Sequence, residues 1–346
     1  MKSFATTDIK KILILKWSAM GDIIIATAAM SDIRQEFPAA SIDLHTTRAW
    51  APLFEQDPRF NEVMTGEVRS LKGILRWLSD VHRGGYDLVV DLQSNDRSRY
   101  LLGLLTVIGW APRYRVGNHP YFPYNISSGL TGVSIHAFEI QKKALVAAGF
   151  KAASERPSLY VPETSRAKVN QLCSQYGLLK DRFAIFFPGS HGAGYLKRWG
   201  AERYANLGRR LVALGIDRSA LVGGPDDFEE CSAIAEFCNA NWLVNLCGQT
   251  HLLDIVALSQ TAKLIVGNDT GTSHVASCSA TPMLVICGPT DPDRVKPVGD
   301  QVFALQANGE CLNCYRKECN YHIHHHCMKS ISVDMVIDKL KVMKAL

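Results

Sequence analysis

The sequence predicts an α/β protein made of two doubly wound, Rossmann-like domains that face each other across a cleft. Strand-like and helix-like segments alternate along the chain, as expected for parallel βαβ units. The 346 residues exceed what a single hydrophobic core usually organises. The stretch 154–166 has two prolines and shows neither the helical nor the strand period of apolar residues. We therefore expect the domain boundary there, with domains over 1–160 and 161–346.

In the first half of the chain, predicted strands and helices alternate from the first apolar run onward. KILILK (11–16) has the pattern of a short buried strand, and the helix predicted over 23–37 stops before Pro38. The later elements follow in the same way: a strand at 41–47, a helix at 71–85, a strand at 86–93, and helices at 97–109 and 136–149. Parallel sheets bind ligands at the carboxyl ends of their strands, so we expect the functional residues there.

The second half repeats this order. Its predicted strands lie at 183–189, 219–225, 242–248, 263–269 and 283–289. Its predicted helices lie at 200–215, 227–240, 251–262 and 271–280. The last helix of the chain is a candidate to pack back on the N-terminal domain.

Composition narrows the class of protein. The formal charge is +5 and hydrophobic residues make up 47%, which is ordinary for a globular protein. No run of like charge suggests a nucleic-acid-binding arm, so we expect no nucleic-acid partner. No secretory signal and no apolar run of bilayer length are evident, which predicts a cytoplasmic protein with at most peripheral contact with the inner membrane.

Polar residues follow three strands of the second half. The helix start after GND (267–269), with its two threonine hydroxyls, would suit a diphosphate, although Asp269 or Thr272 could simply cap the helix. Lys197 precedes another helix and could reach a phosphate, or it could be a solvated base of a surface loop. Asp226 and Asp227 follow a third strand and suit ribose hydroxyls, or the N-cap of the next helix. No Walker loop is present, and the absence of G-x-G-x-x-G after the first strand disfavours a dinucleotide dehydrogenase.

Taken in order, the motifs resemble those of the bacterial heptosyltransferases, glycosyltransferase family nine. They are ILILKWSAMGDIIIATAAM, YDLVVDLQSNDRSR, FPGS with KRW, GGPDD, GNDTGTSHVAS and CGPTDP, within residues 11 to 292. The resemblance implies a GT-B fold and transfer of a heptose from ADP-heptose to the inner core of lipopolysaccharide. It also implies inversion at the anomeric carbon and no cofactor for catalysis.

The resemblance further implies roles for individual residues. Asp22 would be the general base, presented by a tight turn at Gly21, although it could also be the N-cap of the 23–37 helix. Lys197 would neutralise the donor diphosphate, which stabilises the departing ADP. The other donor-binding candidates are Ser190 in the donor loop, Asp226 at the ribose, and Asp269, Thr270, Gly271 and His274 at the diphosphate and sugar.

The acceptor carries carboxylates and phosphates, so a basic patch is expected in the N-terminal domain. Arg97 and Arg99 are the first candidates, and Arg113 and Arg115 are the second. Solvated arginines are the alternative for each.

Four cysteines gather near the end of the chain with spacing typical of metal ligands: Cys311, Cys314, Cys319 and Cys327. They predict a structural zinc or iron site, and reduced packing thiols are the alternative. The related autotransporter heptosyltransferases, which glycosylate proteins, bind iron through such cysteines. A protein heptosyltransferase of that type is therefore an alternative function. A non-catalytic nucleotide-sugar-binding protein is another, but binding alone would not need a base such as Asp22.

Overall fold

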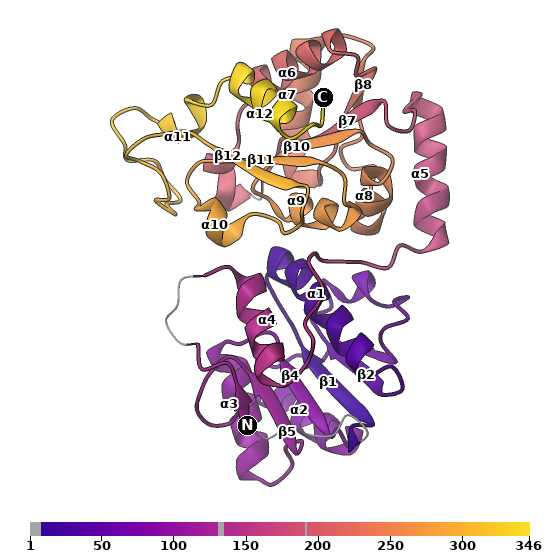
Figure 1. Cartoon of the computed structure of the whole chain (residues 1–346), viewed down its shortest axis with the longest axis vertical. Coiled ribbons are helices and arrows are strands. Elements are labelled where there is room, and N and C mark those ends of the chain that lie inside the picture. Colours follow the sequence, from indigo (N-terminus) through magenta and orange to yellow (C-terminus); the bar gives the residue numbers. More distant parts are fainter. Residues whose placement is uncertain (1–7, 131–134, 191) are drawn as a thin grey trace. The chain divides into compact units, whose positions relative to one another are not determined.

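The computed structural model describes residues 8–130, 135–190 and 192–346, which fall into two compact units (Figure 1). One unit runs to Tyr160 and the other from Val161 to Leu346. Each contains a six-stranded sheet in which all neighbouring strands are parallel. The predicted α/β class with two doubly wound Rossmann-like domains is therefore confirmed.

The sheet of the N-terminal unit has the order β3-β2-β1-β4-β5-β6. Its strands are β1 (Lys11–Leu15), β2 (Ser41–His45), β3 (Glu62–Met64), β4 (Leu88–Asp91), β5 (Tyr114–Gly117) and β6 (Ile126–Ser127). The central strands are buried almost throughout, which is why they are continuous apolar runs and not alternating ones. Because all strands run in one direction, the segments after β1, β2, β3 and β4 meet at one edge of the sheet.

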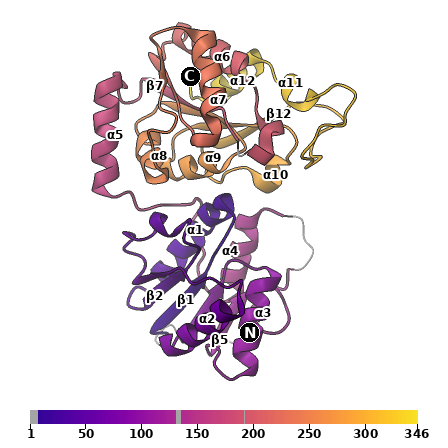
Figure 2. The same cartoon turned by 180° about the vertical axis from the view of Figure 1, so that it is seen from behind.

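Helices cover both faces of this sheet, as Figures 1 and 2 show from opposite sides. The helices are α1 (Met20–Glu36), α2 (Leu71–Gly84), α3 (Asp96–Val107) and α4 (Ala137–Ala147), with a short 3₁₀ turn at Ala51–Leu53. Leu13 and Leu15 of β1 pack against α2 and α3 in one core cluster. Helices α1 and α4 contact each other on the opposite face. Ser70 caps the start of α2, and Gly85 ends it with a φ of 62° that most other residues avoid.

The sheet of the C-terminal unit has the order β12-β11-β10-β7-β8-β9. Its strands are β7 (Phe183–Phe187), β8 (Arg218–Leu221), β9 (Leu243–Asn245), β10 (Leu264–Asn268), β11 (Met283–Cys287) and β12 (Val302–Gln306). Every residue of β7, β10 and β11 is buried. The loops after these three adjacent strands lie together at their carboxyl ends.

The helices of this unit also form two layers. They are α5 (Glu163–Tyr176), α6 (Ala201–Ala213), α7 (Phe228–Cys238), α8 (Leu252–Ser259), α9 (Gly271–Ala276), α10 (Pro292–Val295), α11 (His326–Lys329) and α12 (Val333–Val342), with 3₁₀ turns at Gly192–Lys197, Pro225–Asp227 and Ser277–Ser279. Helices α6, α7 and α12 share one core cluster. Helix α8 contacts both α5 and α9. The last helix, α12, thus buries Val336, Ile337 and Leu340 within its own unit.

The structure differs from the sequence prediction in several elements. Helix α1 begins at Met20, three residues before the predicted start, so Gly21 and Asp22 lie in its first turn. Helix α5 begins at Glu163, inside the stretch predicted to lack periodicity. The short strands β3, β5, β6 and β12 were not predicted, because too few residues carry their pattern. Within the described residues, no helix combines the length and apolar character needed to cross a bilayer.

Candidate functional site

Asp22 occupies the third position of α1 and is half-buried. Its Oδ2 accepts a hydrogen bond from the backbone N–H of Ala19, 3.3 Å away. The N-cap is Ala19, so the N-cap alternative for Asp22 was wrong, although the carboxylate still helps to cap the helix. The predicted turn at Gly21 was also wrong, since the chain turns before Met20 and Gly21 is already helical.

Two further charged residues, which the sequence did not single out, lie at the carboxyl ends of β1 and β4. Lys16, directly after β1, is only 4% exposed, and burial lowers its pKa while the negative charges of Asp22 and Asp91 oppose this. Asp91, the last residue of β4, is buried, which raises its pKa. Tyr124 donates a 2.5 Å hydrogen bond to Asp91, and the backbone amides of Gln93 and Ser94 donate to its other oxygen. Asp22 therefore belongs to a cluster of opposite charges at the carboxyl ends of β1 and β4.

A basic cavity of about 540 Å³ opens at the same edge of the N-terminal sheet. Arg97, from the first turn of α3, lines it together with Arg48 and Arg69, which the sequence analysis missed. Trp17 and Trp50 supply aromatic walls. Among the described residues, none of these three guanidinium groups lies within ion-pair distance of a carboxylate. Glu67 also lines the cavity, which therefore offers three positive charges and one negative charge to a ligand and suits an anionic one.

The other predicted arginines have local partners. The Nη1 of Arg99 lies 3.1 Å from the Nε2 of His119, and Arg99 does not line the cavity. Arg115 donates to the backbone oxygens of Pro112 and Pro123. The guanidinium of Arg113 stacks over the ring of Tyr114, at 5.0 Å from its centroid. Of the four predicted arginines, only Arg97 lines the cavity. The sequence shows which residues are charged but not which groups their guanidiniums contact.

An ion pair joins two loops at the carboxyl ends of the C-terminal sheet. The Nζ of Lys197 lies 2.7 Å from the Oδ2 of Asp269, which directly follows β10. Thr290, beyond β11, donates to the same oxygen at 2.9 Å. Asp269 is 4% exposed, whereas the Lys197 side chain keeps 30% of its surface exposed. Asp269 therefore holds Lys197 while leaving part of the ammonium group accessible.

The start of α9 follows immediately. Thr270 is its N-cap, and its Oγ1 accepts from the backbone N–H of Ser273 at 3.4 Å. The capping alternative named Asp269 or Thr272 as the cap, and it was wrong for both residues. Gly271 is the first residue of the helix, and His274 is buried on it. Asp269, Thr270, Gly271 and His274 therefore lie in one strand-to-helix turn beside Lys197.

Arg198, which the sequence analysis did not single out, organises the remaining donor-site candidates. Its Nη2 donates to the backbone oxygens of Ser190 and Asp226, at 3.2 and 3.1 Å. The Ser190 hydroxyl is turned inward and donates to the carbonyl of Gly194. Asp226 is exposed. Asp227, by contrast, packs so closely that a Cβ at Gly189 would overlap its carboxylate, which explains that glycine.

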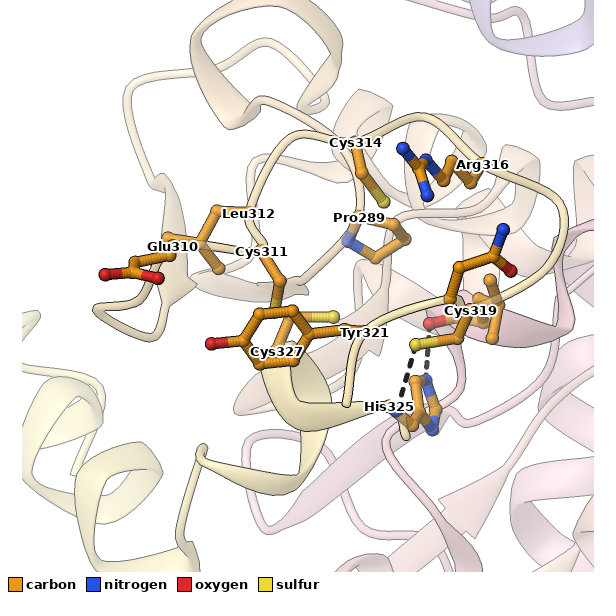
Figure 3. Close-up of a pocket in the computed structure, with 12 residues that line it drawn as sticks. Pro289, Glu310, Cys311, Leu312, Cys314, Arg316, Cys319, Tyr321, His325 and Cys327 are labelled. Carbon is orange, nitrogen blue, oxygen red and sulfur yellow. Dashed lines mark hydrogen bonds between the residues drawn. The ribbon is translucent and has the colours of Figure 1, made fainter. Parts of the chain in front are cut away.

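The four clustered cysteines line one cavity of about 240 Å³, shown in Figure 3. All ten cysteines of the chain are free thiols. Burial, followed by the neighbouring thiols, raises the pKa of Cys327 to about 11. Within residues 8–130, 135–190 and 192–346, no group of three or more His, Cys, Asp or Glu side chains is arranged to hold a metal ion. This arrangement therefore does not support the predicted zinc or iron site.

The histidine-rich stretch beside these cysteines contacts the segment that carries Lys197. The Nε2 of His325 lies 2.6 Å from the backbone oxygen of Leu196. The Nε2 of His324 lies 3.2 Å from the hydroxyl of Tyr195. Further along, Trp199 donates to the backbone oxygen of Ile331 at 2.8 Å. Residues 324–331 thus form hydrogen bonds with residues that precede and follow Lys197 in the chain.

Comparison with known proteins gives consistent results. The family described as glycosyltransferase family 9 (heptosyltransferase) matches residues 74–325. Over 321 residues the chain is 26% identical to lipopolysaccharide heptosyltransferase 2 of Escherichia coli (strain K12), covering 86% of this chain and 88% of that protein.

Two solved structures have a similar fold. A glycosyl transferase family 9 protein from Veillonella parvula superposes with a TM-score of 0.80 at 22% identity, covering 96% of this chain and 97% of that one. The E. coli ADP-heptose lps heptosyltransferase II gives 0.72 at 23% identity, covering 96% and 98%. These two likenesses confirm the fold expected from the sequence.

Proposed function

The chain belongs to glycosyltransferase family 9, the heptosyltransferases, and from this premise we propose that it transfers a heptose from ADP-heptose to the inner core of lipopolysaccharide. The observation that carries the proposal is the family match, which extends over residues 74–325 and so includes parts of both units. We assign the acceptor to the N-terminal unit and the nucleotide sugar to the C-terminal unit.

We propose Asp22 as the general base of a single displacement. The acceptor hydroxyl oxygen attacks the anomeric carbon while the bond from that carbon to the diphosphate breaks. The hydroxyl proton passes to the Asp22 carboxylate, and ADP leaves with the electron pair, so the anomeric configuration inverts. The half-buried position of this carboxylate at the start of α1, which follows the carboxyl end of β1, supports this role.

On the donor side we propose that Lys197 stabilises the negative charge that develops on the leaving diphosphate. An ammonium group has three N–H donors, and the contact with Asp269 uses one of them. The remaining donors are available to phosphate oxygens in a fixed position, which is the arrangement that stabilises a transition state most. Asp269 and Thr290 would then act by orienting Lys197.

For the acceptor we propose the cavity lined by Arg48, Arg69 and Arg97. Guanidinium groups form paired, charge-assisted hydrogen bonds with carboxylates and phosphates, which are the anionic groups of the proposed acceptor. We keep Arg99, two residues after Arg97 on α3 and in contact with His119, as a further acceptor candidate.

The experiment combines purified protein, ADP-heptose and lipopolysaccharide cores truncated at defined positions, with the products identified by mass spectrometry. We expect one added heptose on one truncation and on no other, and NMR of the new linkage should show the anomeric configuration opposite to that of the donor. The Asp22→Asn variant, with its ADP affinity measured in parallel, separates loss of catalysis from loss of binding.

Three results would contradict the proposal. Transfer to none of the truncated cores, together with transfer to an autotransporter protein, would favour the protein heptosyltransferase. Tight ADP-heptose binding without transfer to any acceptor would indicate a binding protein. Retention of the anomeric configuration would exclude the single displacement with Asp22 as base.

A further inference from the structure

Helix α3 has an apolar face that does not enter the protein core. Tyr100, Leu104 and Val107 are 72%, 42% and 75% exposed, and Ile108, just beyond the helix, is also exposed. Their spacing of three to four residues places them on one side of the helix. The opposite side already supplies the core with Leu101, Leu102 and Leu105. The outward apolar face is therefore not needed for folding.

Neighbouring segments enlarge this face. Helix α2 contacts α3 and exposes Leu71 and Leu75 one turn apart. Phe122 is exposed and lies so close to α3 that a Cβ at Gly103 would be 3.2 Å from its ring. Figure 2 shows α2 and α3 together on one side of the sheet. Exposed apolar side chains gathered on neighbouring elements in this way are typical of a binding face.

Positive charges are interspersed with these apolar side chains. Lys72 and Arg76 are exposed and each follows one of the exposed leucines of α2. Arg97 precedes Tyr100 by three residues, and both line an open depression together with Arg69. Two exposed carboxylates, Asp96 and Glu67, lie in the same region, so cations outnumber anions by four to two. An apolar face with a cationic excess complements an anionic lipid surface.

The apolar face is continuous with the basic cavity. Arg69 and Arg97 line both the depression beside Tyr100 and the cavity that also contains Arg48. An amphiphilic ligand could therefore place its anionic head in the cavity while its apolar part stays beside α3. This geometry favours a lipid-linked acceptor over a free sugar phosphate.

We propose that the face formed by Leu71, Leu75, Tyr100, Leu104, Val107 and Phe122 docks on an anionic lipid bilayer, so that the acceptor enters the Arg48–Arg69–Arg97 cavity directly from the membrane. This inference rests on the proposed function, since it takes the acceptor to be a membrane lipid. The exposed apolar side chains leave water on docking, and the four cations meet lipid phosphates.

The test is vesicle co-sedimentation of the full chain. Vesicles of phosphatidylethanolamine with phosphatidylglycerol are compared with vesicles of phosphatidylcholine alone. We expect the wild type to bind the anionic vesicles more strongly, and the Leu104→Gln/Val107→Gln double variant to lose at least about tenfold in partitioning. A matched control, Leu179→Gln/Val342→Gln, changes an exposed leucine and an exposed valine of the C-terminal unit and should bind like the wild type.

Equal vesicle binding by the wild type and the α3 variant, or no binding by the wild type, would overturn the inference. A wild-type dimer that the α3 substitutions convert to monomer, measured by sedimentation velocity without lipid, would instead make this face a self-association surface. Transfer to a de-acylated, water-soluble acceptor should be the same in wild type and α3 variant. If the wild type shows no such transfer, the proposed function fails, whereas the vesicle experiment still decides the docking face.

Discussion

Replacing His325 with alanine should weaken ADP binding although the residue belongs to the histidine-rich stretch and not to the donor loop. The ring Nε2 of His325 must be the donor to the backbone oxygen of Leu196, since a carbonyl only accepts. Leu196 is buried and immediately precedes Lys197. We therefore expect loss of this hydrogen bond to loosen the segment that carries Lys197, the residue proposed to bind the donor diphosphate.

The magnitude follows from the burial of the Leu196 carbonyl region. A neutral hydrogen bond contributes about 0.5–1.5 kcal/mol net, and a buried polar group left without a partner costs about 1–3 kcal/mol. A loss of about 1–2 kcal/mol corresponds to about 5–30-fold in an equilibrium constant. If ADP binding must restore the order of the segment, the affinity for ADP should fall by this factor.

The assay is isothermal titration with ADP, with thermal unfolding measured on the same samples. His325 has a φ of 62°, so alanine and glutamine there carry the same backbone strain. His325→Gln keeps an N–H donor at a comparable distance and should restore most of the affinity. His322→Ala changes an exposed histidine whose described contact is with the ring of Tyr321, and it should bind ADP like the wild type.

A double-mutant cycle distinguishes a positioning role from general destabilisation. In the Lys197→Ala background, His325→Ala should have little further effect on ADP affinity, because the group that it positions is gone. Unchanged ADP affinity in His325→Ala would refute the reasoning. An equal loss of affinity in both backgrounds would refute it as well.

The remaining predictions concern four other sites. Asp22→Asn should lower kcat by about 100-fold or more while the dissociation constant for ADP stays unchanged, and near wild-type turnover would remove the general base. Lys197→Ala should weaken ADP binding by about 1.5–3 kcal/mol in titration calorimetry, as expected for a charge-assisted contact, and unchanged affinity would exclude it from the donor site. Because the pKa of Cys327 is about 11, about one thiol in a thousand is ionised at pH 8, so peptide mass spectrometry should find it alkylated by iodoacetamide long after the exposed Cys314. Burial lowers the pKa of His45 to about 4, whereas an unfolded chain protonates near 6.5. The unfolded state therefore binds more protons between these values, and urea titrations should show the free energy of unfolding falling as the pH drops from about 6.5 to about 4, with a flatter profile in His45→Gln.

The donor candidates illustrate how far strand-end patterns lead. Lys197 and Asp269 were each selected because they follow a predicted strand, and the structure brings them within 2.7 Å of each other. The pairing itself could not be predicted, because it depends on β7 and β10 being neighbours in the sheet. The same limit applies to Thr290, which reaches Asp269 from beyond the adjacent strand β11.

The acceptor side was harder to predict for a different reason. Arg48 and Arg69 come from segments without a clear period, and the sequence offered no signal that separates them from solvated arginines. Only the order β3-β2-β1-β4 brings the loops after β2 and β3 to the start of α3, where Arg97 lies. A guanidinium group is a candidate to bind an anionic ligand when no carboxylate of the protein lies within ion-pair distance of it. Whether this holds depends on the folded structure.

The sequence by itself determined the fold class, the order of the long helices and buried strands, and the family. Periodicity and short motifs are local features of the chain, so they can be recognised without knowing which segments contact each other. Tertiary structure alone decided that Asp22 lies within α1 near Lys16, that one of four candidate arginines enters a cavity, and that His325 supports the Lys197 segment. It also decided that the four cysteines surround a cavity without forming a metal-binding group among the described residues. These outcomes depend on distances between residues far apart in the chain, and such distances follow from strand order and side-chain packing.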